Sequence, residues 1–468
     1  MVEGVPTLSL IAYLVAAVLF IVGLMRMGAP KTARTGNIYA AIGMLIAIVV
    51  TLLLKEVLNY TWILIGIVLG GAIGGVVART VKMTEMPQMV GIYNGFGGAG
   101  SLLIALAEFF RLTSDSSQVF SLENSITIVL TVLIGSVTLS GSLIAFGKLQ
   151  GLVSSRPITY PLQNIWNGII FLAVLAMMVL LVISPGSIPV MIALVAVTLI
   201  LGVLLVIPIG GADMPVVISL LNSYSGIAGA AAGFVLGNMF LIISGALVGA
   251  AGFILTRIMC KAMNRSLGNV MFGAFGAVVQ TSGTGGDAGD KSVREATPED
   301  VGMLLGYAKS VIFVPGYGLA TSQAQHLVAE LATMLEEKGI DVKHAIHPVA
   351  GRMPGHMNVL LAEANVPYDK LFDLDQINNE FERADVAVIV GANDVVNPDA
   401  NNKSDSPLYG MPILNADKAK SVVVIKRSLS PGFAGVDNPL FYMDNTMMFF
   451  RDGKQAFVEL IEEIKHMD

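Results

Sequence analysis

The stretch that decides the fold of this chain is Ser310-Val-Ile-Phe-Val-Pro-Gly316-Tyr-Gly318-Leu-Ala-Thr-Ser-Gln-Ala-Gln325. It starts as a run of β-formers, turns through Gly316-x-Gly318, and continues as a run that predicts a helix. Such a turn favours anion binding, because glycines let backbone N–H groups approach a phosphate and the helix dipole favours negative charge. The third position of the G-x-G-x-x-G pattern is Thr321, so an ordinary strand–helix turn of an α/β domain remains open at this point.

The sequences before and after this stretch differ in kind. The 468-residue chain is 54% hydrophobic with a mean hydropathy of +0.73, which is too apolar for a soluble protein. Residues 1–266 contain 12 Lys/Arg and 7 Asp/Glu, whereas residues 267–468 contain 16 and 27. We therefore predict a transmembrane domain over 1–266, a linker over 267–300 and a soluble domain over 301–468. The acidic surface of the last argues against nucleic acid as a partner.

Nine segments are apolar and long enough to cross a bilayer as helices, which takes about 20 residues each. They are 6–25, 36–54, 60–78, 86–109, 123–147, 165–183, 188–208, 213–236 and 238–260. The first has no basic n-region and no clear cleavage site, so it reads as a retained helix. Ten Lys/Arg fall in one set of connecting loops and two in the other. The positive-inside rule then predicts an N-terminus outside and a cytoplasmic soluble domain.

Polar residues inside three of these segments are candidates for a transmembrane pathway. Asn94 lies in a glycine-rich run, and Asp213 and Asn222 lie nine residues apart on one predicted helix, or ~13 Å and opposite faces. Another segment carries Ser136, Thr138, Ser140 and Ser142. Buried polar groups in lipid are costly and tend to line a pathway, although hydroxyls also serve helix–helix hydrogen bonding. Residues 1–266 contain no histidine, which limits a proton relay built from this chain alone.

The soluble part alternates strand and helix patterns. We predict strands near 310–314, 342–346, 370–373, 386–390, 421–425 and 440–443. We predict helices near 319–338, 356–364, 376–383 and 452–466, and a helix start at Thr297-Pro-Glu-Asp300. Six strands with intervening helices indicate a parallel, doubly wound, Rossmann-like sheet.

Ligands of such sheets bind at the carboxyl ends of the strands, where loops 347–356, 391–398 and 426–435 fall. No acid lies near the end of the second strand to hold ribose hydroxyls, whereas Lys426-Arg427-Ser428 offers two cations and a hydroxyl. That set suits a 2′-phosphate, so NADP is favoured over NAD, the alternative being a solvated pair of cations. Because no cysteines or clustered carboxylates accompany His347 and His356, we expect structural hydrogen bonds there and no metal site.

Long runs of the sequence resemble the beta subunit of proton-translocating NAD(P) transhydrogenase, nearly from end to end. They are Gly210-Gly-Ala-Asp-Met-Pro-Val-Val, Leu221-Asn-Ser-Tyr-Ser-Gly, Met259-Cys-Lys-Ala-Met-Asn-Arg-Ser, Pro315-Gly-Tyr-Gly, His347-Pro-Val-Ala-Gly-Arg, Pro354-Gly-His-Met-Asn-Val-Leu-Leu-Ala-Glu-Ala, Gly391-Ala-Asn-Asp, Lys426-Arg-Ser and Asn438-Pro-Leu-Phe. The resemblance implies NADP(H) on the soluble domain and NAD(H) on a separate alpha subunit, without which the enzyme is inactive. It also implies direct hydride transfer of the Si-Re, B-specific type, coupled to inward proton movement. The implied assembly is a dimer of alpha–beta units in the bacterial inner membrane.

Site residues follow from the resemblance by position. Gly316, Gly318 and Arg352 would hold the pyrophosphate, and Lys426-Arg427-Ser428 the 2′-phosphate. The remaining cofactor-binding set is Tyr317, Val349, Ala350, Gly351, Gly391, Asn393, Asp394 and Gly432. Asp394 would also be a coupling carboxylate, and Asp213, Asn222 and Asn94 would belong to the proton path. No side chain is expected to act as acid or base in the hydride step.

Two positions depart from the family pattern. Some relatives have a membrane histidine where this chain has Asn94, and asparagine does not titrate near neutral pH. The titrating group would then come from the alpha partner or from water held by Asn94. The pattern also has tyrosine where Phe433 stands, which removes any role for that hydroxyl.

Two other function classes fit a membrane domain joined to a nucleotide-binding sheet. A channel or transporter gated by a cytoplasmic nucleotide sensor would carry another solute and need no NAD(H)-binding subunit. An NADP-dependent enzyme anchored to the membrane would not need nine spans.

Overall fold

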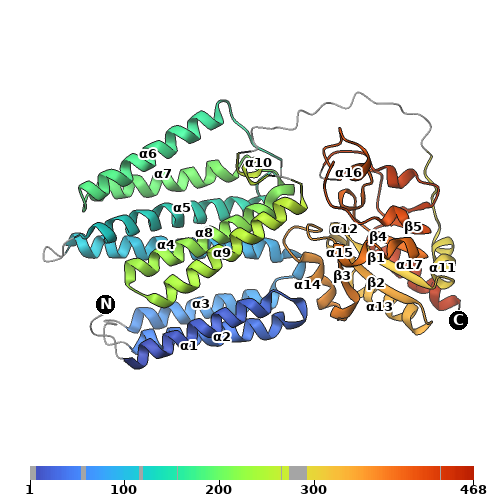
Figure 1. The fold of residues 1–468 in the computed structure, drawn as a ribbon, viewed down its shortest axis with the longest axis horizontal. Coiled ribbons are helices and arrows are strands. Elements are labelled where there is room, and N and C mark those ends of the chain that lie inside the picture. The colour runs from blue at the N-terminus through green and yellow to red at the C-terminus, as the bar shows by residue number, and fades with distance from the viewer. Residues whose placement is uncertain are drawn as a thin grey trace. The chain divides into compact units, whose positions relative to one another are not determined.

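The computed structural model describes residues 7–53, 60–114, 120–154, 156–264, 266–272, 292–432 and 434–467. The chain divides into two compact units, Met1–Thr256 and Arg257–Asp468 (Figure 1). Phe433 and residues 273–291 of the predicted linker lie outside the described residues.

Within the described part of the chain, nine helices are long and apolar enough to cross a membrane, as the sequence predicts. They are α1 (Thr7–Met27), α2 (Pro30–Leu53), α3 (Tyr60–Thr80), α4 (Met86–Ser114), α5 (Leu122–Gln150), α6 (Gln163–Ile183), α7 (Ile188–Val206), α8 (Met214–Leu236) and α9 (Met239–Ala262). Short turns η1 (Met83–Glu85) and η2 (Gly211–Asp213) lead into α4 and α8, and α10 (Leu267–Phe272) follows α9.

Helices α5 and α8 form the centre of the membrane unit. In the most apolar stretch of each helix, 67% of the residues of α5 and 61% of those of α8 are buried, against 0% for α3. Helices α4, α5, α7 and α8 lie side by side (Figure 1). Glycines permit this close packing: a Cβ on Gly98 of α4 would lie 2.7 Å from the carbonyl oxygen of Gly135 on α5. The bundle therefore buries the hydroxyl-bearing face of α5, where Ser136 and Ser142 are fully buried.

The second unit is built on a six-stranded parallel sheet in the order β3-β2-β1-β4-β5-β6. The strands are β1 (Ser310–Pro315), β2 (Asp341–Ile346), β3 (Leu371–Asp373), β4 (Val386–Val390), β5 (Ser421–Ile425) and β6 (Thr446–Phe449). The chain runs outward from β1 to β3, returns to β4 beside β1, and runs outward again. This is the doubly wound order of dinucleotide-binding domains, so the predicted fold class is confirmed.

Alternating side chains divide the sheet's core between its two faces. Val311 and Phe313 of β1 pack with α11 (Pro298–Gly306), α13 (Gln325–Glu337), α14 (His356–Glu363) and α17 (Gly453–His466). Ile312 and Val314 face the other side, where the short elements α15 (Leu374–Ile377), η5 (Phe381–Arg383), α16 (Asp399–Asn402), η7 (Ala416–Lys418) and η8 (Pro439–Tyr442) lie. Both faces of the strands are apolar because both are covered.

Three predicted elements differ from the structure. The strand predicted at 440–443 is the 3-10 turn η8, because Pro439 stands at its first position and the Asn438 side chain accepts from Leu440 N. The strand forms instead at β6, where Thr446 pairs with Val422. The helix predicted at 319–338 is two helices, α12 (Tyr317–Ser322) and α13, separated by Gln323 with φ 51°. The helix predicted at 376–383 is α15 and η5.

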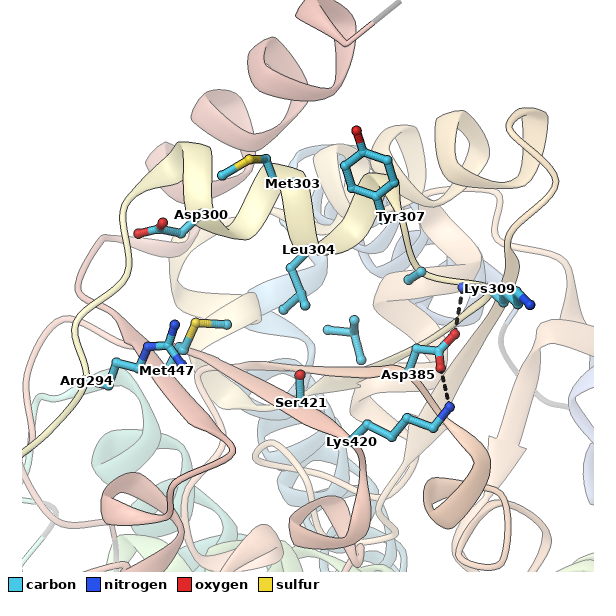
Figure 2. A pocket seen from close by; sticks show the side chains of 12 residues that line it. Arg294, Asp300, Met303, Leu304, Tyr307, Lys309, Asp385, Lys420, Ser421 and Met447 are labelled. Atoms are coloured by element: carbon cyan, nitrogen blue, oxygen red, sulfur yellow. Dashed lines mark hydrogen bonds and ion pairs between the residues drawn. The ribbon is translucent and has the colours of Figure 1, made fainter.

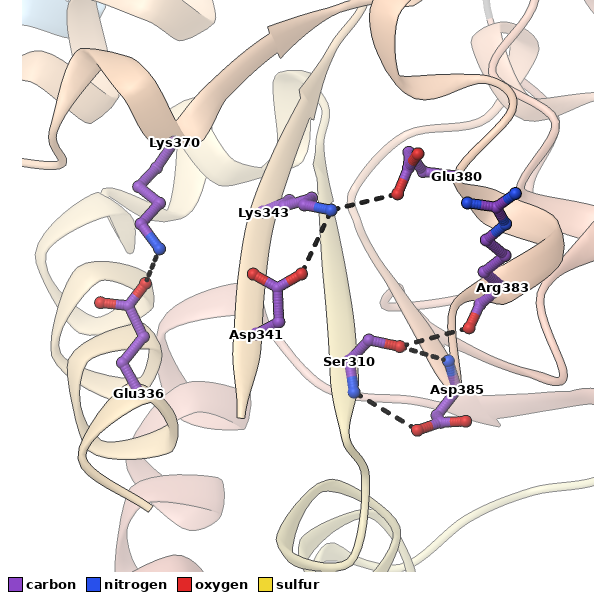
Figure 3. Close-up of polar contacts among 8 residues, drawn as sticks. All are labelled: Ser310, Glu336, Asp341, Lys343, Lys370, Glu380, Arg383 and Asp385. Carbon is purple, nitrogen blue, oxygen red and sulfur yellow. Dashed lines mark hydrogen bonds and ion pairs between the residues drawn. The ribbon is translucent and has the colours of Figure 1, made fainter. Parts of the chain in front are cut away.

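Polar contacts hold the amino ends of the strands together (Figure 3). Asp385, just before β4, accepts from Lys309 N at 2.7 Å and pairs with Lys420 Nζ at 2.7 Å. The Lys420 ammonium and the Lys309 N–H hold the pKa of Asp385 below its usual value. Ion pairs also join Lys343 to Asp341 and Glu380, and Lys370 to Glu336. The carboxyl ends are left to the loops that carry the candidate site.

Candidate functional site

The centre of the site is the crossing of the turns that follow β1 and β4, the two strands at which the sheet order reverses. Gly316 N donates to Val390 O at 2.8 Å, and Gly318 N donates to Gly391 O at 3.0 Å. A Cβ on Gly318 would lie 2.5 Å from Gly391 Cα, and Gly391 has φ +61°. Gly316, Gly318 and Gly391 are therefore required for the two backbones to come into contact. The N–H groups of Gly316 and Gly318 donate to carbonyls of the protein itself.

The loop after β2 places Arg352 beside this crossing. The Arg352 guanidinium carbon lies 4.5 Å from the ring centre of Tyr317, a cation–π contact. Arg352 N donates to His356 Nδ1 at 3.0 Å, and a Cβ on Gly351, at φ +103°, would lie 2.5 Å from the same nitrogen. The buried ring of His356 thus shapes the loop backbone that presents the arginine.

The histidines of this loop make structural hydrogen bonds, as expected. Val349 N donates to His347 Nδ1 at 3.2 Å, so the ring's Nε2–H donates to Pro412 O at 2.8 Å. Burial lowers the pKa of His347 to about 4, against the opposing effect of the Pro412 hydrogen bond. Burial and then the Arg352 charge lower the pKa of His356 to about 4. Both rings are neutral at physiological pH.

The loops after β4 and β5 meet at Asp394. Asp394 Oδ2 accepts from Ala434 N at 3.0 Å, and a Cβ on Gly432 would lie 2.2 Å from Asp394 Oδ1. With the amide of Asn393 turned to match its neighbours, its side-chain oxygen accepts from Gly432 N at 2.7 Å and from Lys426 Nζ at 3.0 Å. The two loops are thus joined by main-chain and side-chain contacts.

Lys426 is held inside this junction. Its Nζ also donates to Ser430 O and lies 4.8 Å from the ring centre of Phe441. Burial lowers the pKa of Lys426, and the charges of Asp394 and Asp437 oppose that shift. Arg427 and Ser428 are exposed. The structure therefore offers one ordered and one solvated cation at the end of β5.

Every predicted residue of the soluble site lies in these four loops. The structure brings the glycine turn, Arg352 and Tyr317 together, and separately joins Asn393, Asp394, Lys426 and Gly432. Sequence reasoning missed the support that Asn438 and Phe441 supply. Asn438 Nδ2 donates to Asn393 O at 3.1 Å. The sequence run Asn438-Pro-Leu-Phe was part of the family resemblance, but it indicated no role for its residues.

These residues fit a dinucleotide. A phosphate needs close backbone and positive charge, which the glycine crossing and Arg352 provide. A 2′-phosphate needs the cations that Lys426 and Arg427 provide. Among the described residues, no cluster of three His, Cys, Asp or Glu side chains could hold a metal ion.

A groove of about 620 Å³ lies at the opposite, amino ends of the strands (Figure 2). Its lining includes Tyr307, Lys309, Asp385 and Lys420, which precede β1, β4 and β5. None of the predicted site residues lines it, because parallel strands put all their carboxyl ends on the other edge.

In the membrane unit, Asn94 of α4 contacts α8, the helix that carries Asn222. Asn94 Nδ2 on α4 donates to Ile218 O on α8 at 3.3 Å, across one turn of helix from Asn222. Asn94 is buried and Asn222 is half-buried. Asp213 closes the turn η2, where its N–H donates to Gly210 O at 3.1 Å, and it stands at the cap position of α8.

The fold defines a class of protein: a polytopic helical membrane protein that carries a doubly wound parallel-sheet domain with a glycine crossing at its switch point. Within that class, the family model described as NAD(P) transhydrogenase beta subunit matches residues 9–463. The chain is 48% identical over 459 residues to the NAD(P) transhydrogenase subunit beta of Rhodospirillum rubrum, covering 97% of this chain and 99% of the relative. A sequence from a designated strain of that organism gives the same values. The chain therefore belongs to the NAD(P) transhydrogenase beta-subunit family.

Proposed function

We propose that this chain binds NADP(H) on its sheet unit and couples hydride exchange with NAD(H), held by an alpha subunit, to proton translocation. The observation that carries the proposal is the joining of the β4 and β5 loops around Lys426 and Asp394, beside the β1–β4 switch point of the sheet. Family membership supports the use of both nucleotides. The bound nicotinamides would supply the hydride chemistry, and the protein would supply position and charge.

The nucleotide contacts divide among the loops. Arg352, steadied over the Tyr317 ring, would bind the pyrophosphate, with Val349, Ala350 and Gly351 forming the backbone around it. Gly316 and Gly318 donate their N–H groups to the carbonyls of Val390 and Gly391. The glycines Gly316, Gly318 and Gly391 would therefore contribute by leaving space for the nucleotide, since they have no side chains.

The end of β5 would set the preference for the 2′-phosphate. Arg427 and Ser428 are exposed to a ligand, although the Ser428 hydroxyl is hydrogen-bonded to Ser430 Oγ at 2.9 Å, while Lys426 is already ordered by Ser430 and Asn393. A 2′-phosphate would compete for the Lys426 ammonium, so its arrival would change the contacts of Asn393 and Asp394. This is the link by which NADP(H) occupancy would reach the coupling carboxylate.

One sheet unit holds one nucleotide site, so a second subunit is needed to bring two nicotinamides into contact. We propose an alpha subunit with the NAD(H) site, transfer of the Si-Re, B-specific type, and a dimer of alpha–beta units. We also propose a bacterial inner membrane, as the family resemblance implies. The loop charges support an N-terminus outside and a sheet unit in the cytoplasm. The boundaries 1–266, 267–300 and 301–468 are proposed on the same charge pattern.

The test is calorimetric titration of the full-length chain in detergent with NADPH and NADH. We expect NADPH to bind tighter by at least about a hundredfold, because two charge-assisted contacts are worth about 1.5–3 kcal/mol each. Changing Lys426 and Arg427 to Ala should remove the preference. The matched control changes the exposed Lys403 and Arg383 to Ala, which removes the same charge elsewhere. Equal binding, or a preference for NADH, would overturn the proposal and favour a nucleotide-gated transporter.

A further inference from the structure

A buried lysine ties α5 to the connection between α7 and α8. Lys148 lies in the last turn of α5 and is 1% exposed. Its Nζ donates to Ile207 O at 2.5 Å, to Ile209 O at 2.7 Å and to Arg156 O at 3.4 Å. These three carbonyl oxygens compensate for the burial of the ammonium, since lysine is almost never fully buried without such partners.

Two of the three carbonyls, those of Ile207 and Ile209, belong to the α7–α8 connection, where Ile207 O also accepts from Ile158 N at 3.4 Å. Helix α7 ends at Val206. Carbonyl groups at and just beyond a helix C-terminus have no N–H partner within the helix. Pro208 contributes no N–H between Ile207 and Ile209. A cation is also favoured there, because a helix C-terminus carries partial negative charge. Lys148 therefore acts as a side-chain cap for α7.

The same segment leads directly to Asp213. Ile209 is followed by Gly210, Gly211 and the turn η2, in which Asp213 N donates to Gly210 O at 3.1 Å. Two adjacent glycines leave this stretch without side chains to fix it. The hydrogen bonds from Lys148 therefore restrain Ile207 and Ile209, the residues that precede this flexible stretch and Asp213.

Helix α5, which carries Lys148, is itself closely packed against its neighbours. Its Gly141 packs so closely that a Cβ would lie 3.1 Å from Val206 Cγ2 and 3.2 Å from Leu221 Cδ2. One residue beyond Lys148, Leu149 O accepts from the buried Gln88 Nε2 of α4 at 3.5 Å. The end of α5 is thus held against α4, α7 and α8 together.

We propose that Lys148 is a positioning residue for proton coupling: it sets the conformation of the 207–213 segment and so the place of Asp213 at the start of α8. Lys148 touches neither nucleotide and takes no part in hydride transfer. This inference rests on the proposed proton-coupled transhydrogenase, in which Asp213 belongs to the proton path.

The experiment uses the assembled alpha–beta complex in proteoliposomes, with NADPH and NAD⁺ as substrates and an enclosed pH-sensitive dye. Lys148→Met should lower kcat and the protons moved per hydride, kcat by about tenfold, with both KM values within about twofold of the parent. Lys148→Arg, which keeps the charge and donors, should restore at least about half of the activity. Lys82→Met is the matched control at an exposed lysine and should behave as the parent.

The outcomes separate this inference from the proposed function. If Lys148→Met pumps and turns over as the parent does, while Asp213→Asn does not, the inference is overturned and the function stands. If neither change affects pumping, the role of Asp213 fails as well. If Lys148→Met does not assemble, Lys148→Gln decides: reduced pumping at unchanged KM supports the inference, and parental pumping overturns it. Equal losses in Lys148→Arg and Lys148→Met at raised KM show a structural role only and also overturn it.

Discussion

Burial, more than residue type, decides what the histidines after β2 do. His347 and His356 lie in a loop at the ligand-binding edge of the sheet, where a histidine invites an acid–base assignment. Their rings instead accept backbone N–H groups, and burial brings each pKa to about 4. These two histidines therefore shape the loop backbone and are neutral near pH 7.

We predict that His347 makes the sheet unit less stable in acid. The ordinary pKa of 6.5 applies to the unfolded chain and about 4 to the folded one, so the unfolded state binds more protons between these values. Stability therefore falls as the pH drops below 6.5, and the loss is complete near pH 4. His347→Gln should reduce this dependence but not abolish it, because the buried His356 has a similarly lowered pKa. At pH 7 the change should cost about 1–2 kcal/mol because Val349 N–H loses its acceptor.

The measurement is urea unfolding of the full-length protein in detergent at several pH values, followed by hydrogen exchange of peptides from β2. His326→Gln, at an exposed position of α13, is the control and should keep the parental pH dependence. The same pH dependence in parent and His347→Gln would contradict the prediction.

At the scale of elements, backbone contact decides which glycines matter. On α4, a Cβ on Gly98 would meet Gly135 O at 2.7 Å and Leu139 N at 2.9 Å, whereas a Cβ on Gly100 would meet nothing within 4 Å. The two positions lie two residues apart in one glycine-rich run, and the sequence pattern does not distinguish them. The distinction depends on which face of α4 lies against α5.

We predict that Gly98→Ala destabilises the α4–α5 pair by about 1–3 kcal/mol, because neither backbone atom it meets is free to move. Gly100→Ala gains the same helix propensity without the contact, so it is the matched control. Thermal unfolding of both variants in the same detergent is the measurement. Equal midpoints for the two variants would show that the close crossing is absent.

At the scale of the whole molecule, the proposed function requires that two units respond to each other. The sheet unit would report nucleotide occupancy through Lys426 and Asp394, and the membrane unit would report proton binding through the segment that ends at Asp213. Coupling of this kind needs a differential effect of each ligand on a shared two-state element. A change at either end should therefore uncouple the reactions without removing the other end's ligand.

We predict that Asp213→Asn lowers proton translocation by at least about tenfold, equivalent to 1.4 kcal/mol, while NADPH binding to the full-length chain stays unchanged. The carboxylate is lost while the size and polarity of the side chain are kept, and no side-chain cap of α8 is removed, since the Asp213 side chain makes no capping hydrogen bond. Proton movement in proteoliposomes and NADPH titration in detergent are the two measurements. Glu123→Gln, in the exposed first turn of α5, removes a carboxylate elsewhere as the control. Normal pumping by Asp213→Asn would sink the assignment.

Local patterns were enough to predict the broad fold and to collect the candidate residues. Helix spans follow from the length of apolar runs, and the sheet follows from strand patterns that alternate with helix patterns. The turn at Gly316-x-Gly318 and the cap at Thr297 could be predicted because a few neighbouring residues determine them. Thr297 caps α11 as expected, and in the structure it also forms a capping box with Asp300. Asp394 and Lys426 follow β4 and β5, as predicted, and they come together because the carboxyl ends of parallel strands meet at one edge.

Local sequence was enough to predict the membrane spans, the doubly wound class and the loops proposed to hold a nucleotide, because each depends on periodicity or on adjacent residues. The break at Gln323, the position of β6, the use of the Gly316 and Gly318 amides, and the burial of Lys148 depend on tertiary contacts. These features join residues far apart in the chain: Gly318 meets Gly391, and Lys148 meets Ile207 and Ile209. Local propensity is worth a fraction of a kcal/mol per residue, and a buried contact outweighs it.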